Sequence, residues 1–483
     1  MQLKTPQLFK NQCYIDGEWR SAAGGATFPV HNPSKGTLIG EVPNMGAAET
    51  KSAIETAAKA LPAWRGKTAK ERSQILRRWY ELILEHSEDL AVIMTTEQGK
   101  PLAESQTEIR YGASFVEWFS EEAKRVYGDV ILSAVKDQHL VVIKQPIGVV
   151  AAITPWNFPS AMITRKCAPA LAVGCTIVLK PAEATPFSAF ALAELASRAG
   201  IPPGVLNILT GTPAVIGTEM TSNPVVRKVT FTGSTRVGKL LMAQSASTVK
   251  KISLELGGSA PFLIFADTDI DAAVKGLIAS KFRNTGQACI CADRIFVEDK
   301  IYKDFTAALV QATKRLKVGD GFEPGVQQGP LINAAALEKV ERHVQDAVSK
   351  GAVIACGGKR HPLGKTFYEP TILCDVNPSM AIMREETFGP VAPLMRFHTE
   401  AEAIRMANDT NYGLASYVYT RDIDRVWRVS EQLEFGMVSV NGGIFSNEVA
   451  PFGGVKESGI GREGSKYGID DFLEIKYICM SAS

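Results

Sequence analysis

The sequence lacks any imbalance of charge. Lys and Arg total 53 and Asp and Glu total 51 in 483 residues, so the formal net charge is only +2. A chain without a broad cationic field attracts neither nucleic acid nor an anionic membrane surface, and we expect neither as a partner. With 45% hydrophobic and 22% charged residues, the composition also excludes a mainly disordered or fibrous protein.

Long apolar runs and a dense set of cysteines are missing as well. No stretch reaches the roughly 18 apolar residues that a membrane-spanning helix needs, and no apolar segment follows a basic start at the N-terminus. Eight cysteines in 483 residues are too few for a disulfide scaffold. We therefore expect a cytoplasmic protein whose thiols are mostly reduced and buried.

Short β-branched runs alternate with helical patterns between residues 147 and 256. Five such runs separated by four helical segments predict a parallel sheet covered on both faces. We expect strands over 148–154, 176–180, 205–210, 227–232 and 251–256, and helices over 160–172, 187–199, 213–221 and 235–246. Upstream, apolar residues at helical spacing predict two helices within 46–98 and a third over 101–125.

A second series of strands and helices follows and predicts a second α/β unit. Its strands are expected over 261–266, 294–299, 352–357, 368–373 and 417–422, and its helices over 271–282, 302–316, 335–351 and 399–409. Hairpin-like alternation over 127–146 and a strand-like segment over 472–480 lie outside both units. Such outlying strands suit pairing with another subunit.

Two segments at strand ends carry residues suited to a dinucleotide. FTGSTRVGK places Gly233 and Gly238 where a strand leads into a helix, and a helix N-terminus favours a pyrophosphate. The spacing is not G-x-G-x-x-G, so an ordinary strand-to-helix turn explains these glycines as well. LKPAE ends another strand, where Glu183 can accept the hydroxyls of a ribose, although a solvated loop explains Lys180 and Glu183 equally well.

Three residues in different segments have the chemistry of a covalent catalyst. Cys289 lies in a glycine-containing loop, and a thiolate adds readily to a carbonyl, although most single cysteines are inert core residues. Glu255 ends an apolar strand, where a carboxylate is costly unless it is paired or functional. Asn157 in TPWNFP offers a side-chain amide that can donate to an oxyanion.

Taken together, PWNFP, KPAE, FTGST-x-x-G, ELGG, GQ-x-C, EETFGP and PFG resemble the aldehyde dehydrogenase superfamily in order and spacing, over essentially the whole chain. AMITRK, SKFRN-x-GQ, IFSNEVAPFGG and GREGSKYGID resemble in particular succinate-semialdehyde dehydrogenases, and glutarate-semialdehyde dehydrogenases look similar. The resemblance implies an α/β fold with a Rossmann-type cofactor domain, an α/β catalytic domain and a small bridging element for a homo-oligomer, dimer or tetramer. We expect these at 1–126 with 147–256, at 257–455, and at 127–146 with 456–483, respectively.

The resemblance also implies how the residues act. Cys289 would attack the aldehyde carbon of succinate semialdehyde, and Asn157 with the Cys289 backbone N–H would hold the oxyanion. Glu255 would activate the water that hydrolyses the resulting thioester. Lys166 and Glu463 match positions that the family uses for proton relay.

For the cofactor, the resemblance implies NAD, with NADP as the alternative. It places Trp156, Lys180, Glu183, Gly233 and Ser234 around the adenosine and pyrophosphate, Leu256 against the nicotinamide, and Glu386 and Phe388 at the nicotinamide ribose. A carboxylate at residue 183 would repel the 2′-phosphate of NADP, so we expect a preference for NAD.

For the substrate, Arg165 and Arg283 match two arginines that similar enzymes use to clamp a distal carboxylate, and Ser446 matches a third contact. Without the resemblance, solvated charges on helix faces explain both arginines better. Cys291 lies two residues after Cys289, and the pair either forms a reversible disulfide switch or is a matter of packing. A metal site at this pair is not expected, because no further ligands cluster nearby.

Other functions stay open from the sequence alone. One methylene separates succinate semialdehyde from glutarate semialdehyde and is worth only about 1–3 kcal/mol of discrimination, so both compounds, or a broader range of aliphatic aldehydes, fit the sequence. A catalytically silent homologue would not need Cys289, Glu255 and Asn157 together. A cofactor-free esterase using Cys289 would not explain the dinucleotide loops.

Overall fold

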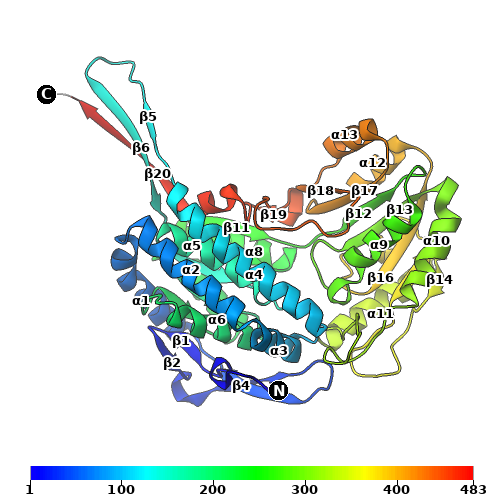
Figure 1. The fold of residues 1–483 in the computed structure, drawn as a ribbon, viewed down its shortest axis with the longest axis horizontal. Coiled ribbons are helices and arrows are strands. Elements are labelled where there is room, and N and C mark those ends of the chain that lie inside the picture. The colour runs from blue at the N-terminus through cyan, green and yellow to red at the C-terminus, as the bar shows by residue number, and fades with distance from the viewer. Residues whose placement is uncertain (1, 482–483) are drawn as a thin grey trace.

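A computed structural model describes residues 2–481. Figure 1 shows two α/β units side by side and a strand arm that projects from one of them. An eight-stranded sheet with the order β19-β11-β10-β7-β8-β9-β1-β2 forms the first unit. Its central strands run parallel, as expected, and are β7 (Val149–Ile153), β8 (Thr176–Lys180), β9 (Leu206–Ile208), β10 (Val226–Thr232) and β11 (Lys251–Glu255). The expected doubly wound α/β class is therefore confirmed.

The intervening helices lie close to their expected positions. They are α5 (Ala161–Val173), α6 (Pro186–Arg198), α7 (Pro213–Ser222) and α8 (Thr235–Ser245). Further strands that were not expected extend this sheet or form a separate hairpin: β1 (Cys13–Ile15), β2 (Glu18–Arg20), β3 (Thr27–His31) and β4 (Leu38–Pro43). Strands of three to six residues with mixed polarity give too little alternation to be recognised in a sequence.

The prediction of two helices within 46–98 was wrong, because the structure has three. They are α1 (Ala47–Arg65), α2 (Ala69–Glu85) and α3 (Ser87–Gln98), followed by α4 (Leu102–Glu122). The apolar pattern continues across His86, whose ψ of 16° interrupts the helix without glycine or proline. At the other end of α2, Thr68 and Glu71 form a capping box that fixes its start.

The second unit contains a seven-stranded sheet with the order β14-β15-β16-β13-β12-β17-β18. Its strands are β12 (Ala260–Ile264), β13 (Ala292–Glu298), β14 (Val353–Cys356), β15 (Thr371–Cys374), β16 (Val391–Phe397), β17 (Ala415–Tyr419) and β18 (Met437–Val440). Its helices are α9 (Ile270–Lys281), α10 (Asp299–Thr313), α11 (Ala334–Ser349), α12 (Glu400–Asn408) and α13 (Ile423–Gln432). Three of these elements, β16, β18 and α13, were not expected from the sequence.

A three-stranded arm of β5 (Asp129–Ile131), β6 (Gln138–Pro146) and β20 (Leu473–Ser481) leaves the first unit and ends near the C-terminus (Figure 1). Apolar side chains on the arm are exposed, among them Val130, Leu132 and Ile475. By contrast, β19 (Gly459–Ile460) pairs with β11, so the start of the C-terminal segment lies on the first sheet. Among residues 2–481, none of the helices combines the length and hydropathy required to cross a membrane.

Candidate active site

A cavity of about 360 Å³ is lined by residues from both units. From the first unit it receives the segments that follow the carboxyl ends of β7, β10 and β11, which is where parallel sheets bind ligands. From the second unit it receives the loop before β13, the start of α11 and the loop before β16. The lining includes the expected site residues Trp156, Asn157, Gly233, Ser234, Leu256, Cys289, Glu386 and Phe388.

Cys289 is a half-buried residue in the lining of this cavity, and it follows a loop with unusual backbone geometry. Asn284 and Thr285 both have positive φ, 49° and 58°, although neither is glycine. On the other side, a Cβ at residue 258 would overlap the Cys289 carbonyl, so Gly258 permits the close approach. Burial raises the pKa of the Cys289 thiol to about 12, although the nearby Arg165 charge opposes the shift. At neutral pH the thiol is therefore protonated, and attack requires a base.

Asn157 is held by hydrogen bonds at its side chain and its backbone. Its Nδ2 donates to the carbonyl oxygen of Gln287 at 3.0 Å. Its own carbonyl oxygen accepts from Lys100 Nζ at 2.6 Å and from Asn284 Nδ2 at 3.0 Å. Because an amide nitrogen carries two hydrogens, one N–H of Asn157 stays available for a ligand beside Cys289.

Glu255 is a buried carboxylate with an orphaned oxygen. Its Oε2 has no hydrogen-bond partner among the described residues, and a Cβ on Gly453 would lie 2.9 Å from its Oε1. Burial, reinforced by the negative charge of Glu463, raises the pKa of Glu255 well above its usual value. A carboxylate with a raised pKa is suited to take a proton at neutral pH.

Glu463 joins two basic residues of α5. It pairs with Lys166 through Oε1, and its Oε2 lies 2.8 Å from Arg165 Nη2. Lys166 also donates to Thr232 Oγ1 at 2.5 Å. Burial alone would raise the pKa of Glu463, but the charges of Lys166 and Arg165 outweigh it and lower that pKa. The pKa of Glu255 is thus raised, and the pKa of the nearby Glu463 is lowered. Opposite pKa shifts of two neighbouring carboxyl groups are typical of acid–base sites.

The cofactor residues expected beside the cavity fit a dinucleotide. Ser234 begins α8, so the N-terminus of this helix faces the cavity, and a Cβ on Gly233 would overlap the Phe231 ring. Glu386 accepts from the Gly258 N–H at 3.0 Å through Oε1, and burial raises its pKa to about 7. Its Oε2 makes no hydrogen bond among the described residues and can accept from a ribose. The Phe388 ring meets Trp156 edge-on at 5.6 Å.

Three residues expected near the dinucleotide lie outside the lining of the Cys289 cavity. Lys180 and Glu183 do not line the cavity of Cys289 but form an ion pair with each other at the end of β8. That end is adjacent to the segment of Trp156, because Lys180 pairs with Ile153 of β7. Gly238 packs under Leu256, whose side chain a Cβ at residue 238 would overlap, so packing explains this glycine.

The three expected substrate contacts are divided between two places. Arg165 contacts Tyr111, whose hydroxyl forms a hydrogen bond with Ser446. Arg283 lies 4.9 Å from the Phe158 ring and lines a second cavity of about 360 Å³. No ion pair or hydrogen bond of Arg283 is found among residues 2–481.

Cys291 points into the core next to this region. Its Sγ donates to the Lys281 carbonyl at 3.3 Å, and the side chain packs in a cluster with Phe158 and Met162. Burial raises the pKa of its thiol to about 12. Within the described part of the chain, no group of His, Cys, Asp and Glu residues could hold a metal ion.

Sequence reasoning missed several residues at the site. Lys339 of α11 lines the cavity, but in the sequence it reads as one polar position of an amphipathic helix. Tyr111 of α4 contacts Ser446, and Lys100, between α3 and α4, contacts Asn157; both lie far from any motif. Only their burial and contacts single them out.

Comparison with known proteins agrees with this geometry. The aldehyde dehydrogenase family model matches residues 19–478. A glutarate-semialdehyde dehydrogenase of Pseudomonas aeruginosa is 62% identical over 480 residues, covering 99% of both chains. A succinate-semialdehyde dehydrogenase [NADP(+)] of Escherichia coli is 59% identical, covering 99% of this chain and 100% of its own. The crystal structure of a Burkholderia pseudomallei succinate-semialdehyde dehydrogenase has a TM-score of 0.99 at 60% identity, with both chains fully covered.

The chain belongs to the aldehyde dehydrogenase family. Members of this family are oxidoreductases that use NAD or NADP. The family membership confirms the resemblance expected from the sequence, while the substrate and the preferred cofactor need argument of their own.

Proposed function

We propose that this aldehyde dehydrogenase oxidises succinate semialdehyde to succinate, with NAD preferred over NADP. Cys289 gives its thiol proton to Glu255, and its sulfur adds to the aldehyde carbon and forms a thiohemiacetal whose oxygen carries the negative charge. The free N–H of Asn157 and the backbone N–H of Cys289 stabilise the negative oxygen that develops. A nicotinamide cofactor bound in the cavity supplies a hydride acceptor, which the N-terminus of α8, Glu386 and Phe388 would hold.

Hydrolysis of the thioester on Cys289 then requires an activated water. Glu255 is the base, because its raised pKa and its unpartnered Oε2 suit removal of a proton from water. The hydroxide adds to the thioester carbon, the carbon–sulfur bond breaks, and the acid is released with a regenerated thiol. Glu463 and Lys166 would relay away from Glu255 the proton taken from the thiol and the proton taken from water; the ion pair between them and the effect of the Glu463 charge on Glu255 support this role.

The assignment of the substrate class rests on Arg283, whose guanidinium group forms no ion pair among residues 2–481. Arg283 is half-buried, and its charge acts on the buried Glu104 in the lining of the same cavity without forming an ion pair with it, so an anionic ligand would give the guanidinium a direct partner. Phe158 lies under Arg283 and packs with Cys291 and Met162 beside the nucleophile loop. Arg165, with a buried Nε that lacks a partner, approaches the same cluster through Tyr111. Both observations support a substrate with a negative group a few bonds from its aldehyde.

The experiment is a comparison of substrates in Arg283→Ala. We expect KM for succinate semialdehyde to rise by about 100-fold, since a charge-assisted contact of about 3 kcal/mol is lost. KM for butanal, a neutral aldehyde of the same chain length, should hardly change. Arg315→Ala, in the exposed turn that follows α10, is the matched control and should change neither value. Equal effects on both aldehydes would contradict the proposal.

Glutarate semialdehyde is the second candidate substrate, because the 62% identical relative carries that name. The two compounds differ by one methylene, which is worth about 1–3 kcal/mol. A kcat/KM panel of C3 to C5 semialdehydes ranks them directly. A preference for neutral aliphatic aldehydes would instead favour a broad aldehyde dehydrogenase.

The preference for NAD is supported by Glu183. A unit charge about 4 Å from a carboxylate costs about 4 kcal/mol at an effective dielectric constant of about 20, so the 2′-phosphate of NADP is repelled. The ion pair with Lys180 reduces this cost without removing it. We expect a higher kcat/KM with NAD than with NADP and a reversal in Glu183→Ser. A wild-type enzyme that favours NADP would contradict the assignment.

Two further proposals concern assembly and regulation. The exposed apolar side chains of the β5–β6–β20 arm support a homo-oligomer, a dimer or a dimer of dimers, measurable by sedimentation. A disulfide between Cys289 and Cys291 would require Cys291 to leave the Lys281 carbonyl. We expect peroxide to inactivate the wild type reversibly, with no disulfide formed in Cys291→Ala.

A further inference from the structure

Lys100 is a fully buried lysine just after α3, and its ammonium group lies against the candidate site. Its Nζ donates to the main-chain carbonyl oxygen of Asn157 at 2.6 Å and pairs with Glu108 Oε2 at 2.5 Å. The ammonium also lies 4.1 Å from the centre of the Phe158 ring. The side chains of Lys100 and Glu108 are at most 1% exposed, so water does not compete for these contacts.

Glu108 connects the same lysine to the start of α5. Its Oε1 accepts from the backbone N–H of Ser160 at 2.9 Å and of Ala161 at 3.3 Å. These N–H groups have no partner within the helix, and a carboxylate there is stabilised by the helix dipole. The segment that carries Asn157 is therefore held both at the Asn157 carbonyl and where it enters α5.

The nucleophile loop meets this segment at the same carbonyl. Asn284 Nδ2 donates to the carbonyl oxygens of Asn157 and Gln287, at 3.0 and 3.2 Å. The Asn284 Oδ1 in turn accepts from Gln98 Nε2 at 3.0 Å. The Gln287 carbonyl also accepts from the Asn157 side chain. The backbone and the side-chain amide of Asn157 are thus both fixed relative to the loop of Cys289.

A second buried lysine shows that such contacts are not a general consequence of burial. Lys228 of β10 is as deeply buried, lies 5.0 Å from the Phe472 ring and 4.0 Å from Asp471 Oδ2. Its Nζ has no hydrogen-bond partner among residues 2–481, and the side chain does not line the cavity. Lys228 and Lys100 therefore each lie near a carboxylate and an aromatic ring of their own. They differ in that only Lys100 donates a hydrogen bond to Asn157.

We propose that Lys100, with Glu108 as its counter-ion, is a positioning residue for the oxyanion site: it fixes the Asn157 carbonyl so that the free side-chain N–H stays aimed beside Cys289. The inference rests on the role proposed above for Asn157. It does not depend on which semialdehyde is the substrate.

The test is Lys100→Met, assayed with propanal and NAD because propanal needs no carboxylate clamp. Since loss of an oxyanion donor costs about 10²–10³-fold, we expect misalignment to lower kcat by roughly 30-fold with KM for NAD unchanged. Alkylation of Cys289 by iodoacetamide forms no oxyanion and should keep its wild-type rate. In an Asn157→Ala background, Lys100→Met should add no further loss, because the amide it positions is gone.

Lys228→Met is the matched control, and its kcat should stay at the wild-type value. If Lys100→Met does not fold, Glu108→Gln replaces it in the test. Its kcat should fall less than that of Lys100→Met, with KM for NAD and the alkylation rate again unchanged. A wild-type kcat in Lys100→Met, parallel losses of kcat and alkylation, or a loss that multiplies with Asn157→Ala would overturn the proposal. A wild-type kcat in Asn157→Ala alone would instead contradict the proposed role of Asn157.

Discussion

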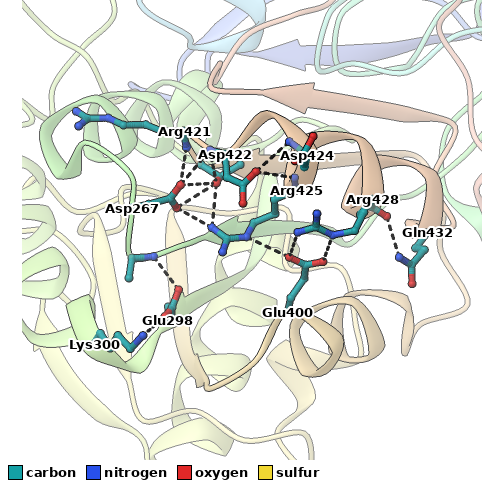
Figure 2. A network of polar contacts seen from close by, with 12 residues as sticks. Asp267, Glu298, Lys300, Glu400, Arg421, Asp422, Asp424, Arg425, Arg428 and Gln432 are labelled. Carbon is teal, nitrogen blue, oxygen red and sulfur yellow. Dashed lines mark hydrogen bonds and ion pairs between the residues drawn. The ribbon is translucent and has the colours of Figure 1, made fainter.

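Two clusters of charged side chains in this protein differ in their exposure to water and in their chemistry. The site charges are Glu255 of β11, Lys166 and Arg165 of α5, and Glu463, and all four side chains are almost fully buried. The α13 network surrounds Asp267 and Glu400 on the surface of the second unit and includes Arg425 and Arg428 (Figure 2). Side chains of this network are 23–49% exposed.

The α13 network has the simpler electrostatics. Asp267 accepts from Thr420 Oγ1, from the Arg421 N–H at 2.9 Å and from Arg425 Nη1 at 2.9 Å, and so fixes the loop before α13 (Figure 2). Partial burial would raise the pKa of Asp267, but the hydrogen bonds from Thr420 and Arg421 and the Arg425 charge lower it. The pKa of Glu400 is lowered as well, by its hydrogen bonds and charge contacts with Arg428 and Arg425, so both carboxylates stay ionised at neutral pH, which is what a structural network requires.

Burial changes the chemistry of the site charges. Glu255 is driven towards its protonated form by burial and by Glu463, and the Cys289 thiol is driven towards its neutral form. Exclusion of water therefore shifts the pKa values of Glu255 and Cys289 so that these side chains can exchange protons during a reaction, which the residues of the α13 network do not do. The two regions are distinguished by how completely they exclude water.

The largest effect should come from removing the nucleophile. In Cys289→Ala we expect aldehyde oxidation to fall by about 10⁵-fold or more, because the covalent route is lost. Cys356→Ala, a half-buried cysteine of β14, is the matched control and should retain wild-type turnover. Residual activity within tenfold of wild type in Cys289→Ala would assign the chemistry to another residue.

Glu255→Gln should have the next largest effect. Loss of a general base lowers turnover by about 10³-fold, because the water that attacks the thioester is no longer activated. The same substitution in the α13 network, Glu400→Gln, should leave kcat unchanged. Steady-state kcat with a saturating aldehyde measures both, and equal effects would erase the distinction between the regions.

The pH dependence of Cys289 alkylation tests whether burial keeps the thiol protonated at neutral pH. With a thiol pKa near 12, the thiolate fraction rises about tenfold per pH unit, so alkylation by iodoacetamide should accelerate steadily from about pH 7 to pH 9. The measurement is the inactivation rate of the enzyme without cofactor. A plateau near neutral pH would mean that the free enzyme already holds a thiolate.

The smallest effect is expected in the α13 network. Asp267→Asn should lower the free energy of unfolding by about 1 kcal/mol without changing kcat, since solvent screens these contacts. Because the pKa of Asp267 is lowered on folding, its contribution is present above the unfolded pKa of about 3.9 and is lost as pH falls below it. Denaturant titrations at about pH 7 and about pH 3 should therefore differ for wild type more than for the variant. Asp304→Asn, an exposed aspartate of α10, is the control.

The sequence predicted the parallel strands of the first unit closely because each is a short apolar run followed by a helix. It missed β16, where Pro393 and Arg396 interrupt the apolar pattern, and α13, which buries only Val429. At the site, motifs located the residues that line the cavity. The ion pair of Arg165 with Glu463 and the contacts of Lys100 depend on segments far apart in the chain, and no local pattern encodes them.

The most direct test of the account is the state of Cys289 in Glu255→Gln during turnover. If Cys289 carries the substrate and Glu255 releases it, mixing this variant with NAD and succinate semialdehyde should trap a succinyl thioester on Cys289. Mass spectrometry of the intact protein and of its peptides should find one succinyl group per chain, and only at Cys289. An unmodified Cys289 after NADH has formed, or an acyl group on another residue, would contradict the account.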